Sequence, residues 1–445
     1  MAPMGKKRGH GASGRSPRNA SRNRGTRGRR GPGLEPSPER IAAELARKLA
    51  SEARCAVPEV ESSLDAEMFA SSLVSTWRLG PGAPIDADPE EEIGLRVVAA
   101  LERAGDERAL AVLRGMEAVG SEAVASASGA AARRLAEAGM DERAWRDGLG
   151  TAQARRALIM RDAVFDDAVN VLVEFERPGH EPYLVGVLID HNLGGIAKDL
   201  LVGPSLAELE ESVARAPTEV AGAGELRFDE IELAEAAVRS REALWRTEHT
   251  LDPPVSDDFA PQLAAVAAHV AALPEGGSYE PEEVSDSDRQ AALDGFLASP
   301  EAEPFHDSGE VADLAMLAID YCADYLDGGG RPLRWSPVVV ELFMTWFLPR
   351  KVVREPEFFE RAVPELLQAW VRYAGRVRGI PLAAVEEAAG AVAAFRDDML
   401  ALVRDESTWG PGKALAMAAH EAGVDLGDQA ALDAFIDEYN ARRAA

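Results

Sequence analysis

Residues 169–191, VNVLVEFERPGHEPYLVGVLIDH, decide the fold class of the central part of this 445-residue chain. From Val169 to Glu176, valine and phenylalanine alternate with polar residues, which is the two-residue period of a half-buried strand. Residues 178–182 contain two prolines and a glycine, which is typical of a turn, and a more apolar run follows over residues 183–191. The stretch therefore predicts an antiparallel hairpin.

The apolar residues of the two runs predict the register of this hairpin. We expect Phe175 to pair with Val185, because the apolar side chains of both strands then share one face. This register places His191 on the apolar face and Asp190 beside Asn170 on the other face.

The segments around the hairpin predict further strands and helices. Third and fourth strands are expected at residues 196–202 and 226–233. Ser205 opens a helix with a capping box, since Glu208 follows three positions later. We also expect a very apolar helix over residues 337–347, broken by Pro349, and a single helix over residues 382–403.

Conventional start and stop signals mark the helices of the N-terminal part. Ser37-Pro38-Glu39 and Asp88-Pro89-Glu90 are start signals, and Gly80-Pro81-Gly82 is a break. Gly105 closes one helix and Asp106 caps the next. Helices of this length with short connections pack as antiparallel neighbours.

Together these patterns predict an α+β protein that is predominantly α-helical. We expect a disordered basic Arg/Gly/Ser tail at residues 1–36 and an N-terminal helical array at residues 37–163. A small central antiparallel β module with helices follows at residues 164–273. An acidic linker at residues 274–287 then leads to a C-terminal helical domain at residues 288–445.

Composition excludes several classes of protein. No apolar run reaches the ~18 residues that a membrane-spanning helix requires. The only cysteines, Cys55 and Cys322, form neither a disulfide framework nor a zinc-thiolate site at this spacing. We therefore expect a cytoplasmic protein without membrane contact, metal or cofactor.

The charge of the chain is unevenly distributed. The formal net charge is -28, from 48 basic and 76 acidic residues. Residues 1–34 hold ten of the basic residues and none of the acidic ones, so the remainder carries 38 basic against 76 acidic side chains. The tail has almost nothing apolar to bury, which predicts disorder when it is alone.

The tail also suggests a function. Residues 24–31, RGTRGRRG, resemble Arg/Gly segments that bind RNA or single strands through phosphate contacts and guanidinium stacking. The candidate nucleic-acid-binding residues are Arg22, Arg24, Arg27, Arg29 and Arg30. In the alternative interpretation, the tail is simply solvated or lies against its own acidic body.

The densest polar group of the body lies where the hairpin ends. Asp190, His191 and Lys198 flank a turn through two glycines, and Asp166 and Asp167 precede the first strand. His191 suits a general base or metal ligand, the aspartates suit orienting or coordinating roles, and Lys198 could balance an anion. In the structural interpretation, His191 is a core histidine and the rest is turn chemistry.

The layout of helices, hairpin and helices resembles that of uncharacterised, mostly helical bacterial proteins with no known activity. The resemblance covers the middle and C-terminal parts and transfers no functional residue.

A second group of basic residues lies within the acidic body. Residues 331–378 contain nine basic and five acidic side chains, with Trp335, Trp346, Trp370 and Tyr373 interleaved. The anion-binding candidates are Arg350, Lys351, Arg354, Arg372 and Arg376. In the alternative interpretation, the aromatic residues belong to the core and the arginines pair with glutamates.

These observations predict an interaction or scaffold protein rather than an enzyme. Its tail would contact RNA, DNA or another polyanion weakly, and its acidic body would engage a protein partner. One alternative is a metal-assisted hydrolase centred on Asp190 and His191. Another is a structural protein with an inert tail.

Overall fold

The computed structural model describes residues 38–77, 90–178, 180–215, 226–279, 283–326, 331–424 and 429–444. The described residues from Ala42 onward belong to one compact unit. The predicted tail at residues 1–36 and the break at Gly80-Pro81-Gly82 lie outside the described residues, as do Asp88 and Pro89.

Helices pack around an apolar core in the N-terminal part of this unit. They are α1 (Pro38–Ala56), η1 (Val57–Glu59), α2 (Ser63–Ser75), η2 (Glu90–Gly94), α3 (Leu95–Ala104), α4 (Glu107–Val119), α5 (Glu122–Glu137) and η3 (Ala144–Gly148). The predicted boundary between α3 and α4 is confirmed. Gly105 ends α3 with a φ of 62°, and the Asp106 carboxylate accepts a hydrogen bond from the Ala109 amide.

The centre of the chain is a five-stranded antiparallel sheet with the order β4-β3-β2-β1-β5. The strands are β1 (Gln153–Asp162), β2 (Ala168–Glu176), β3 (Tyr183–Asp190), β4 (Ile196–Gly203) and β5 (Leu226–Ile231). The hairpin and the third and fourth predicted strands are therefore present, as β2, β3, β4 and β5. The turn η4 (His191–Leu193) joins β3 to β4.

The register of the hairpin differs from the predicted one by two residues. Phe175 pairs with Tyr183 rather than Val185, and Asp190 lies opposite Ala168 rather than Asn170. The pairing extends to Tyr183 because its ring stacks on Phe175, with 6.1 Å between the ring centroids. A two-residue shift leaves every side chain on the same face, so the predicted apolar face is preserved.

Strand β1 was not predicted. Its sequence, QARRALIMRD, places four apolar residues in succession between arginines, which gives no two-residue period. It pairs with β2 on one side and β5 on the other, so both of its edges are hydrogen-bonded. The division of the chain into domains at residues 163, 273 and 287 stays a prediction.

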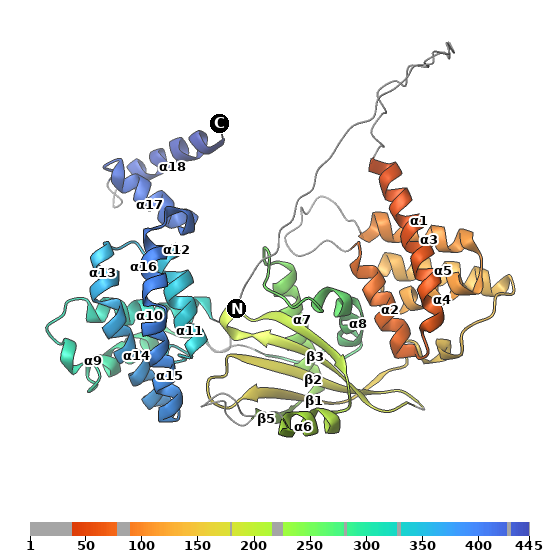
Figure 1. The fold of residues 1–445 in the computed structure, drawn as a ribbon, viewed down its shortest axis with the longest axis horizontal. Helices are drawn as coiled ribbons and strands as arrows, with labels where there is room; N and C mark the ends of the chain where they lie inside the picture. The colour runs from red at the N-terminus through yellow and green to blue at the C-terminus, as the bar shows by residue number, and fades with distance from the viewer. Residues whose placement is uncertain are drawn as a thin grey trace, which may run out of the picture. The chain divides into compact units, whose positions relative to one another are not determined.

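Helices cover both faces of the sheet (Figure 1). Helices α7 (Leu233–Glu248) and α8 (Phe259–Ala271) pack on the face that carries Val171, Val173 and Val185. Helix α6 (Leu206–Arg215) packs through Leu206 on the opposite face, against Leu158 and Leu184. The predicted capping box of α6 is present, because the Ser205 and Glu208 side chains each bond the other residue's amide.

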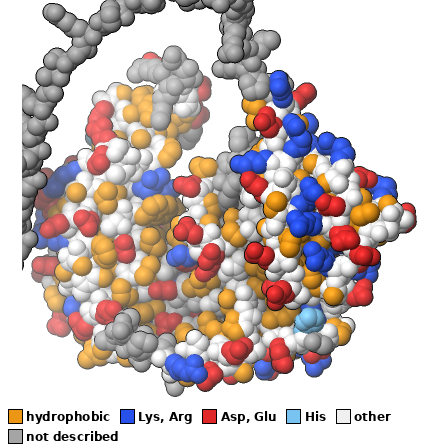
Figure 2. Space-filling view, turned by 45° about the vertical axis from the view of Figure 1, so that its right-hand side comes forward, with side chains coloured by type: hydrophobic (Ala, Val, Ile, Leu, Met, Phe, Trp, Pro, Cys, Tyr) orange, Lys and Arg blue, Asp and Glu red, His pale blue; other side chains and the backbone are white. Residues whose placement is uncertain are grey.

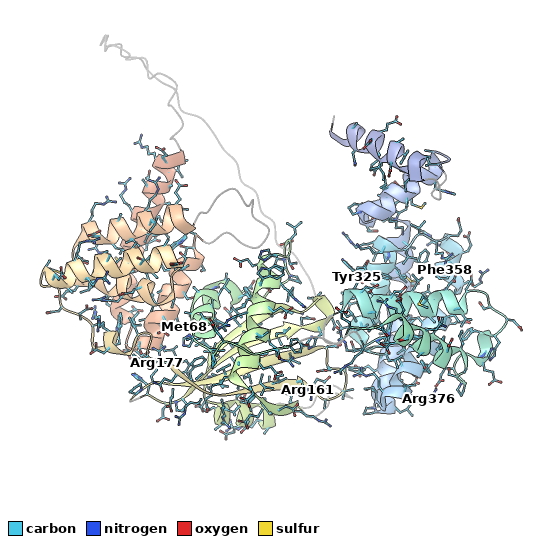
Figure 3. All side chains as sticks on the ribbon, turned by 180° about the vertical axis from the view of Figure 1, so that it is seen from behind. Met68, Arg161, Arg177, Tyr325, Phe358 and Arg376 are labelled. Atoms are coloured by element: carbon cyan, nitrogen blue, oxygen red, sulfur yellow. The ribbon has the colours of Figure 1, made fainter. Side chains whose placement is uncertain are left out.

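A buried group of polar side chains connects the sheet to α2 and α8. Arg177, which follows β2, forms an ion pair with Glu67 of α2 and donates a hydrogen bond to the Tyr183 hydroxyl. The Tyr183 hydroxyl also bonds the His269 ring of α8. Figure 3 labels Arg177 close to Met68 of α2. Because the charges are buried, removing one partner of the ion pair would cost about 3–5 kcal/mol.

The C-terminal part is helical. It contains α9 (Asp286–Leu297), η5 (Glu303–Phe305), α10 (Val311–Tyr325), α11 (Pro337–Leu342), η6 (Phe343–Phe347), α12 (Leu348–Lys351), α13 (Pro356–Arg361), α14 (Val363–Arg378), α15 (Leu382–Ala394), α16 (Arg396–Arg404), η7 (Glu406–Thr408), α17 (Pro411–Glu421) and α18 (Gln429–Ala444). Buried aromatic residues, among them Trp335, Phe343 and Trp370, form much of its core.

Two of the helix predictions in this part were wrong. The helical segment that starts at Pro337 is not broken by Pro349 but runs to Lys351, with a π-helical turn over Phe343–Phe347. This π-helical turn changes the backbone hydrogen-bond pattern just before Pro349, which has no N–H to donate. The predicted helix at residues 382–403 is two helices, which meet at Phe395.

The predicted fold class, α+β and predominantly α-helical, is confirmed. No helix in the described parts of the chain has the length and apolar composition needed to cross a membrane. Acidic and basic side chains lie interspersed on the face shown in Figure 2.

Candidate functional site

The turn after β3 positions the polar residues that the sequence singled out. Gly194 and Gly195 both have positive φ, at 73° and 75°, a conformation that glycine adopts without steric cost. The Asp190 carboxylate accepts a hydrogen bond from the Asn192 amide at 2.9 Å and so stabilises the start of the turn. Asp190 and His191 are both buried at this end of the sheet.

The structure brings four of the five predicted catalytic candidates together. Lys198 of β4 forms an ion pair with Asp190, with 2.8 Å between Nζ and Oδ2. The His191 amide donates to the Asp167 carbonyl at 2.9 Å. Asp167, Asp190, His191 and Lys198 therefore form one group, which we call the sheet-end cluster.

Arg334 joins this cluster from a segment more than 140 positions away. Its guanidinium donates to Asn192 Oδ1 at 2.6 Å, to Asp167 Oδ1 at 3.1 Å and to the His191 carbonyl at 3.2 Å. Burial raises the pKa of Asp167, while hydrogen bonds from Ser336 and Asn192 and the charge of Arg334 act in the opposite direction. Sequence reasoning missed this role, because nothing in the local pattern pairs Arg334 with the hairpin.

Asp166, the fifth candidate, lies beside the cluster in a strained conformation. Its φ is 60°, which is uncommon for a residue with a Cβ atom. One carboxylate oxygen faces Arg331 at 3.4 Å, and the other is buried with no hydrogen-bond partner among the described residues. Nη1 of Arg378 is also buried without a partner. Burial lowers the pKa of Arg378 most, and the positive charges of Arg331 and Arg334 lower it further.

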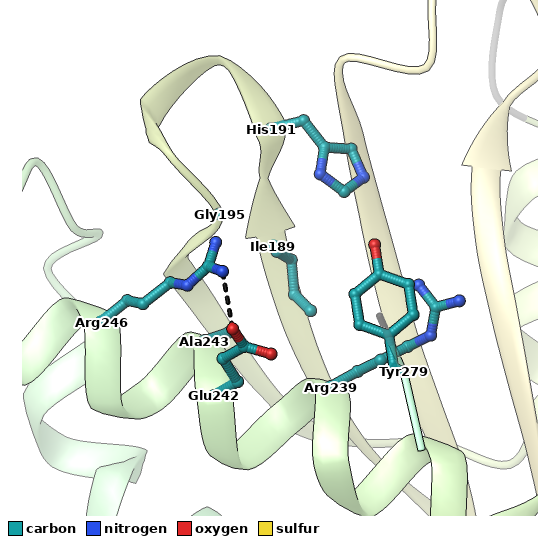
Figure 4. Close-up of a pocket in the computed structure, with 8 residues that line it drawn as sticks. All are labelled: Ile189, His191, Gly195, Arg239, Glu242, Ala243, Arg246 and Tyr279. Carbon is teal, nitrogen blue, oxygen red and sulfur yellow. Dashed lines mark hydrogen bonds and ion pairs between the residues drawn. The ribbon is translucent and has the colours of Figure 1, made fainter. Parts of the chain in front are cut away.

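A cleft opens on the side of His191 that faces α7 (Figure 4). The cleft is shallow and half open, with about 260 Å³ of empty space that includes open solvent, and its lining residues are Ile189, His191, Gly195, Arg239, Glu242, Ala243, Arg246 and Tyr279. The side chains of His191 and Tyr279 point toward one another across it. Arg239 lies over the Tyr279 ring and pairs with Glu235, and Arg246 pairs with Glu242.

The charged side chains of the sheet-end cluster mainly form ion pairs that neutralise one another. Asp190 is neutralised by Lys198 and Asp167 by Arg334, and His191 packs beside Ile189 at the cleft. Within the described ranges, no three His, Cys, Asp or Glu side chains form a group that could hold a metal ion. The structural interpretation of His191 and the hydrolase both stay untested.

The predicted anion-binding residues fall into two groups. Arg354 pairs with Asp313, Arg372 with Glu386 and Arg376 with Glu301. Arg350 and Lys351 form no ion pair with any described residue and instead lie over aromatic rings. Three of the five candidates are therefore already paired with acidic side chains, and the anion site stays a prediction.

The aromatic residues interleaved with these arginines differ in their burial. Trp335, Trp370 and Tyr373 are buried, as the structural interpretation expects. Trp346 is instead exposed over 41% of its surface. The tail candidates Arg22, Arg24, Arg27, Arg29 and Arg30 lie outside the described residues.

Lys413 is a buried cation that the sequence did not identify as one. Its Nζ donates to the Pro349 carbonyl at 2.8 Å and lies over the rings of Phe359 and Trp409. Burial lowers its pKa to about 8. The surrounding sequence, Gly410-Pro411-Gly412-Lys413, resembles part of a phosphate-binding loop, but Ala414 stands where that motif requires Ser or Thr.

Comparisons of the chain with protein-family models, curated proteins and solved structures find no match.

Proposed function

We propose that this chain is an interaction protein whose basic N-terminal tail makes weak, salt-sensitive contacts with RNA, DNA or another polyanion. One observation carries the proposal. Residues 1–34 hold ten basic and no acidic side chains, whereas the rest of the chain has 38 basic against 76 acidic ones. A polyanion would be attracted to the tail and repelled by the body.

The ion pairs of the body support this division. Most of the arginines that the sequence proposed as an anion site are already neutralised by acidic neighbours, among them Arg354, Arg372 and Arg376. Exposed ion pairs contribute little stability, but they reduce the positive potential that a phosphate would meet. The tail, with ten basic and no acidic side chains, is then the stretch whose net charge attracts a polyanion.

A cytoplasmic location is part of the same proposal. Cys55 is exposed and Cys322 is buried, and both are free thiols. Unpaired thiols are typical of a reducing compartment, where RNA and acidic protein surfaces are both accessible.

The proposal is tested by measuring binding of a fluorescent single-stranded RNA at several salt concentrations. The full chain should lose affinity with salt, with a slope in log–log form of about 0.7 per phosphate neutralised. A chain without residues 1–34 should lose nearly all binding. Arg→Gln substitution at Arg22, Arg24, Arg27, Arg29 and Arg30 should give a shallower salt dependence.

Arg372→Gln and Arg376→Gln are matched controls, because these arginines belong to the body and are ion-paired. They should leave both affinity and slope unchanged. Equal RNA binding by the chain without residues 1–34 would refute the tail as the site of contact.

A further inference from the structure

Two aromatic side chains are exposed together on the C-terminal helices. Tyr325 at the end of α10 is 37% exposed and Trp346 is 41% exposed. Their rings meet edge to face, with 6.2 Å between the centroids and 71° between the planes. Figure 3 labels Tyr325 among these helices. Two exposed rings that lie in contact offer a larger continuous aromatic surface than a single exposed side chain does.

Two cations without acidic partners accompany these rings. The Arg350 guanidinium lies 5.8 Å from the centroid of Trp346, and Lys351 Nζ lies 5.6 Å from that of Tyr325. Neither forms an ion pair with any described residue. We call Tyr325, Trp346, Arg350 and Lys351 the aromatic–basic patch.

The core beneath the patch holds its rings in place. Tyr325 stacks on buried Tyr321, with 6.1 Å between centroids and 22° between planes, and meets the edge of Phe347 at 5.1 Å. Trp346 lies in the π-helical turn, between residues whose side chains are buried, such as Met344 and Phe347. Rings fixed in this way lose little conformational entropy when a ligand stacks on them.

We propose that the aromatic–basic patch binds single-stranded nucleic acid, with an unpaired base stacking on Trp346, Tyr325 supporting that ring, and phosphates contacting Arg350 and Lys351. Adjacent stacking rings and cations are the combination that single strands recognise. A duplex does not present its base faces, and an acidic peptide would need the cations without the rings. The inference rests on the proposed contact with polyanions, but it uses different residues.

The test measures fluorescence anisotropy of a labelled pyrimidine single strand of about 12 nucleotides with the full chain. Trp346→Ala should weaken binding by about 5- to 100-fold, which is the contribution expected of one stacked base, and Trp346→Phe should retain most of it. The double variant Arg350→Gln with Lys351→Gln should weaken binding and reduce its salt dependence.

Matched controls separate stacking from general effects. Trp245→Ala removes a tryptophan that is 57% exposed on α7, and it should leave binding unchanged. Arg372→Gln removes an exposed but ion-paired arginine and should also have no effect. Binding of heparin and of a duplex of the same sequence should not change in Trp346→Ala.

A second measurement does not depend on the alanine variant folding. The single strand should quench tryptophan emission of the full chain, and Trp346→Phe should lose that quenching while still binding. Unchanged single-strand affinity in Trp346→Ala would overturn the proposal, and so would an equal loss of heparin binding, which would indicate a site that reads charge alone.

The outcome for the patch is distinguishable from that for the tail. If the patch does not bind nucleic acid but the tail binds polyanions, the tail Arg→Gln variant loses affinity for both RNA and heparin. Trp346→Ala then keeps its affinity for both. If the tail is inert, Trp346→Ala still lowers single-strand affinity in the tail variant.

Discussion

His269 shows how a single buried residue connects stability to pH. Its Nδ1 lies 2.8 Å from the Ala265 carbonyl, which can only accept, so Nδ1 carries the proton. Nε2 is then the acceptor for the Tyr183 hydroxyl at 2.8 Å. Burial lowers the pKa of His269 below its ordinary 6.5, although Glu67 and the Ala265 carbonyl act in the opposite direction. The folded protein therefore holds this ring neutral.

This environment predicts a loss of stability in acid. As the pH falls below 6.5, His269 takes up a proton in the unfolded chain before it does so in the folded one. The unfolded state then binds more protons, so the free energy of unfolding falls, by at most about 1.4 kcal/mol per pH unit. Urea denaturation of wild type and of His269→Gln at about pH 7.5 and about pH 5.5 measures the difference. The wild type should lose more stability than the variant over this interval, and parallel losses would contradict the assignment.

Two glycines show how element boundaries depend on backbone conformation. Gly105 ends α3 with a φ of 62°, and a Cβ atom there would meet nothing closer than 3.8 Å. Gly390 lies inside α15 with helical φ, and a Cβ atom there would meet nothing within 4 Å. A methyl side chain therefore fits at either site, and the two sites differ only in the backbone conformation that the residue must adopt.

The same substitution should have opposite effects at these two sites. Gly105→Ala should destabilise the protein by about 1 kcal/mol, because an alanine in the left-handed region is strained. Gly390→Ala should stabilise it by about 0.5–1 kcal/mol, because alanine is the better helix former and lowers the entropy of the unfolded chain. Thermal or urea unfolding of both variants tests the pair, and a shift of the same sign in both would argue against this explanation.

At the scale of the whole molecule, Arg334 connects the sheet to the C-terminal helices. It lies just before α11 and bonds three acceptors at one end of the sheet, Asp167 before β2 and Asn192 and the His191 carbonyl in the turn between β3 and β4. Its side chain is 3% exposed, so these bonds form away from water. Arg331 provides a contrast, since its bond to Asp166 is partly exposed and 3.4 Å long.

Arg334→Lys should therefore be far more destabilising than Arg331→Lys. A lysine keeps the charge but lacks the planar fork that reaches several acceptors, so buried oxygens would lose their donors at a cost of about 2–3 kcal/mol. Arg331→Lys should change stability by no more than about 0.5 kcal/mol. Urea unfolding curves of both variants measure this difference in the free energy of unfolding. An equal loss of stability in the two variants would show that Arg334 is not the connecting residue.

The sequence predicted the local features of this fold and part of the sheet-end cluster. Alternation around Val171 indicated the hairpin, and Asp106 and Ser205 marked helix starts that the structure contains. Asp190, His191 and Lys198 were grouped because they lie within nine positions of one another. These features depend on short-range periods and on side chains that bond their own backbone, so a window of a few residues is sufficient.

Tertiary structure alone decided the pairings between distant segments. Arg177 bonds Glu67 across 110 positions and Arg334 bonds Asn192 across 142, while β1 is a strand because β2 and β5 supply its hydrogen bonds. Trp346 and Trp370 both lie in apolar helical segments, yet only Trp346 is exposed. Such outcomes depend on the packing of the whole chain, because the free energy of burying a side chain is set by neighbours that no local window contains.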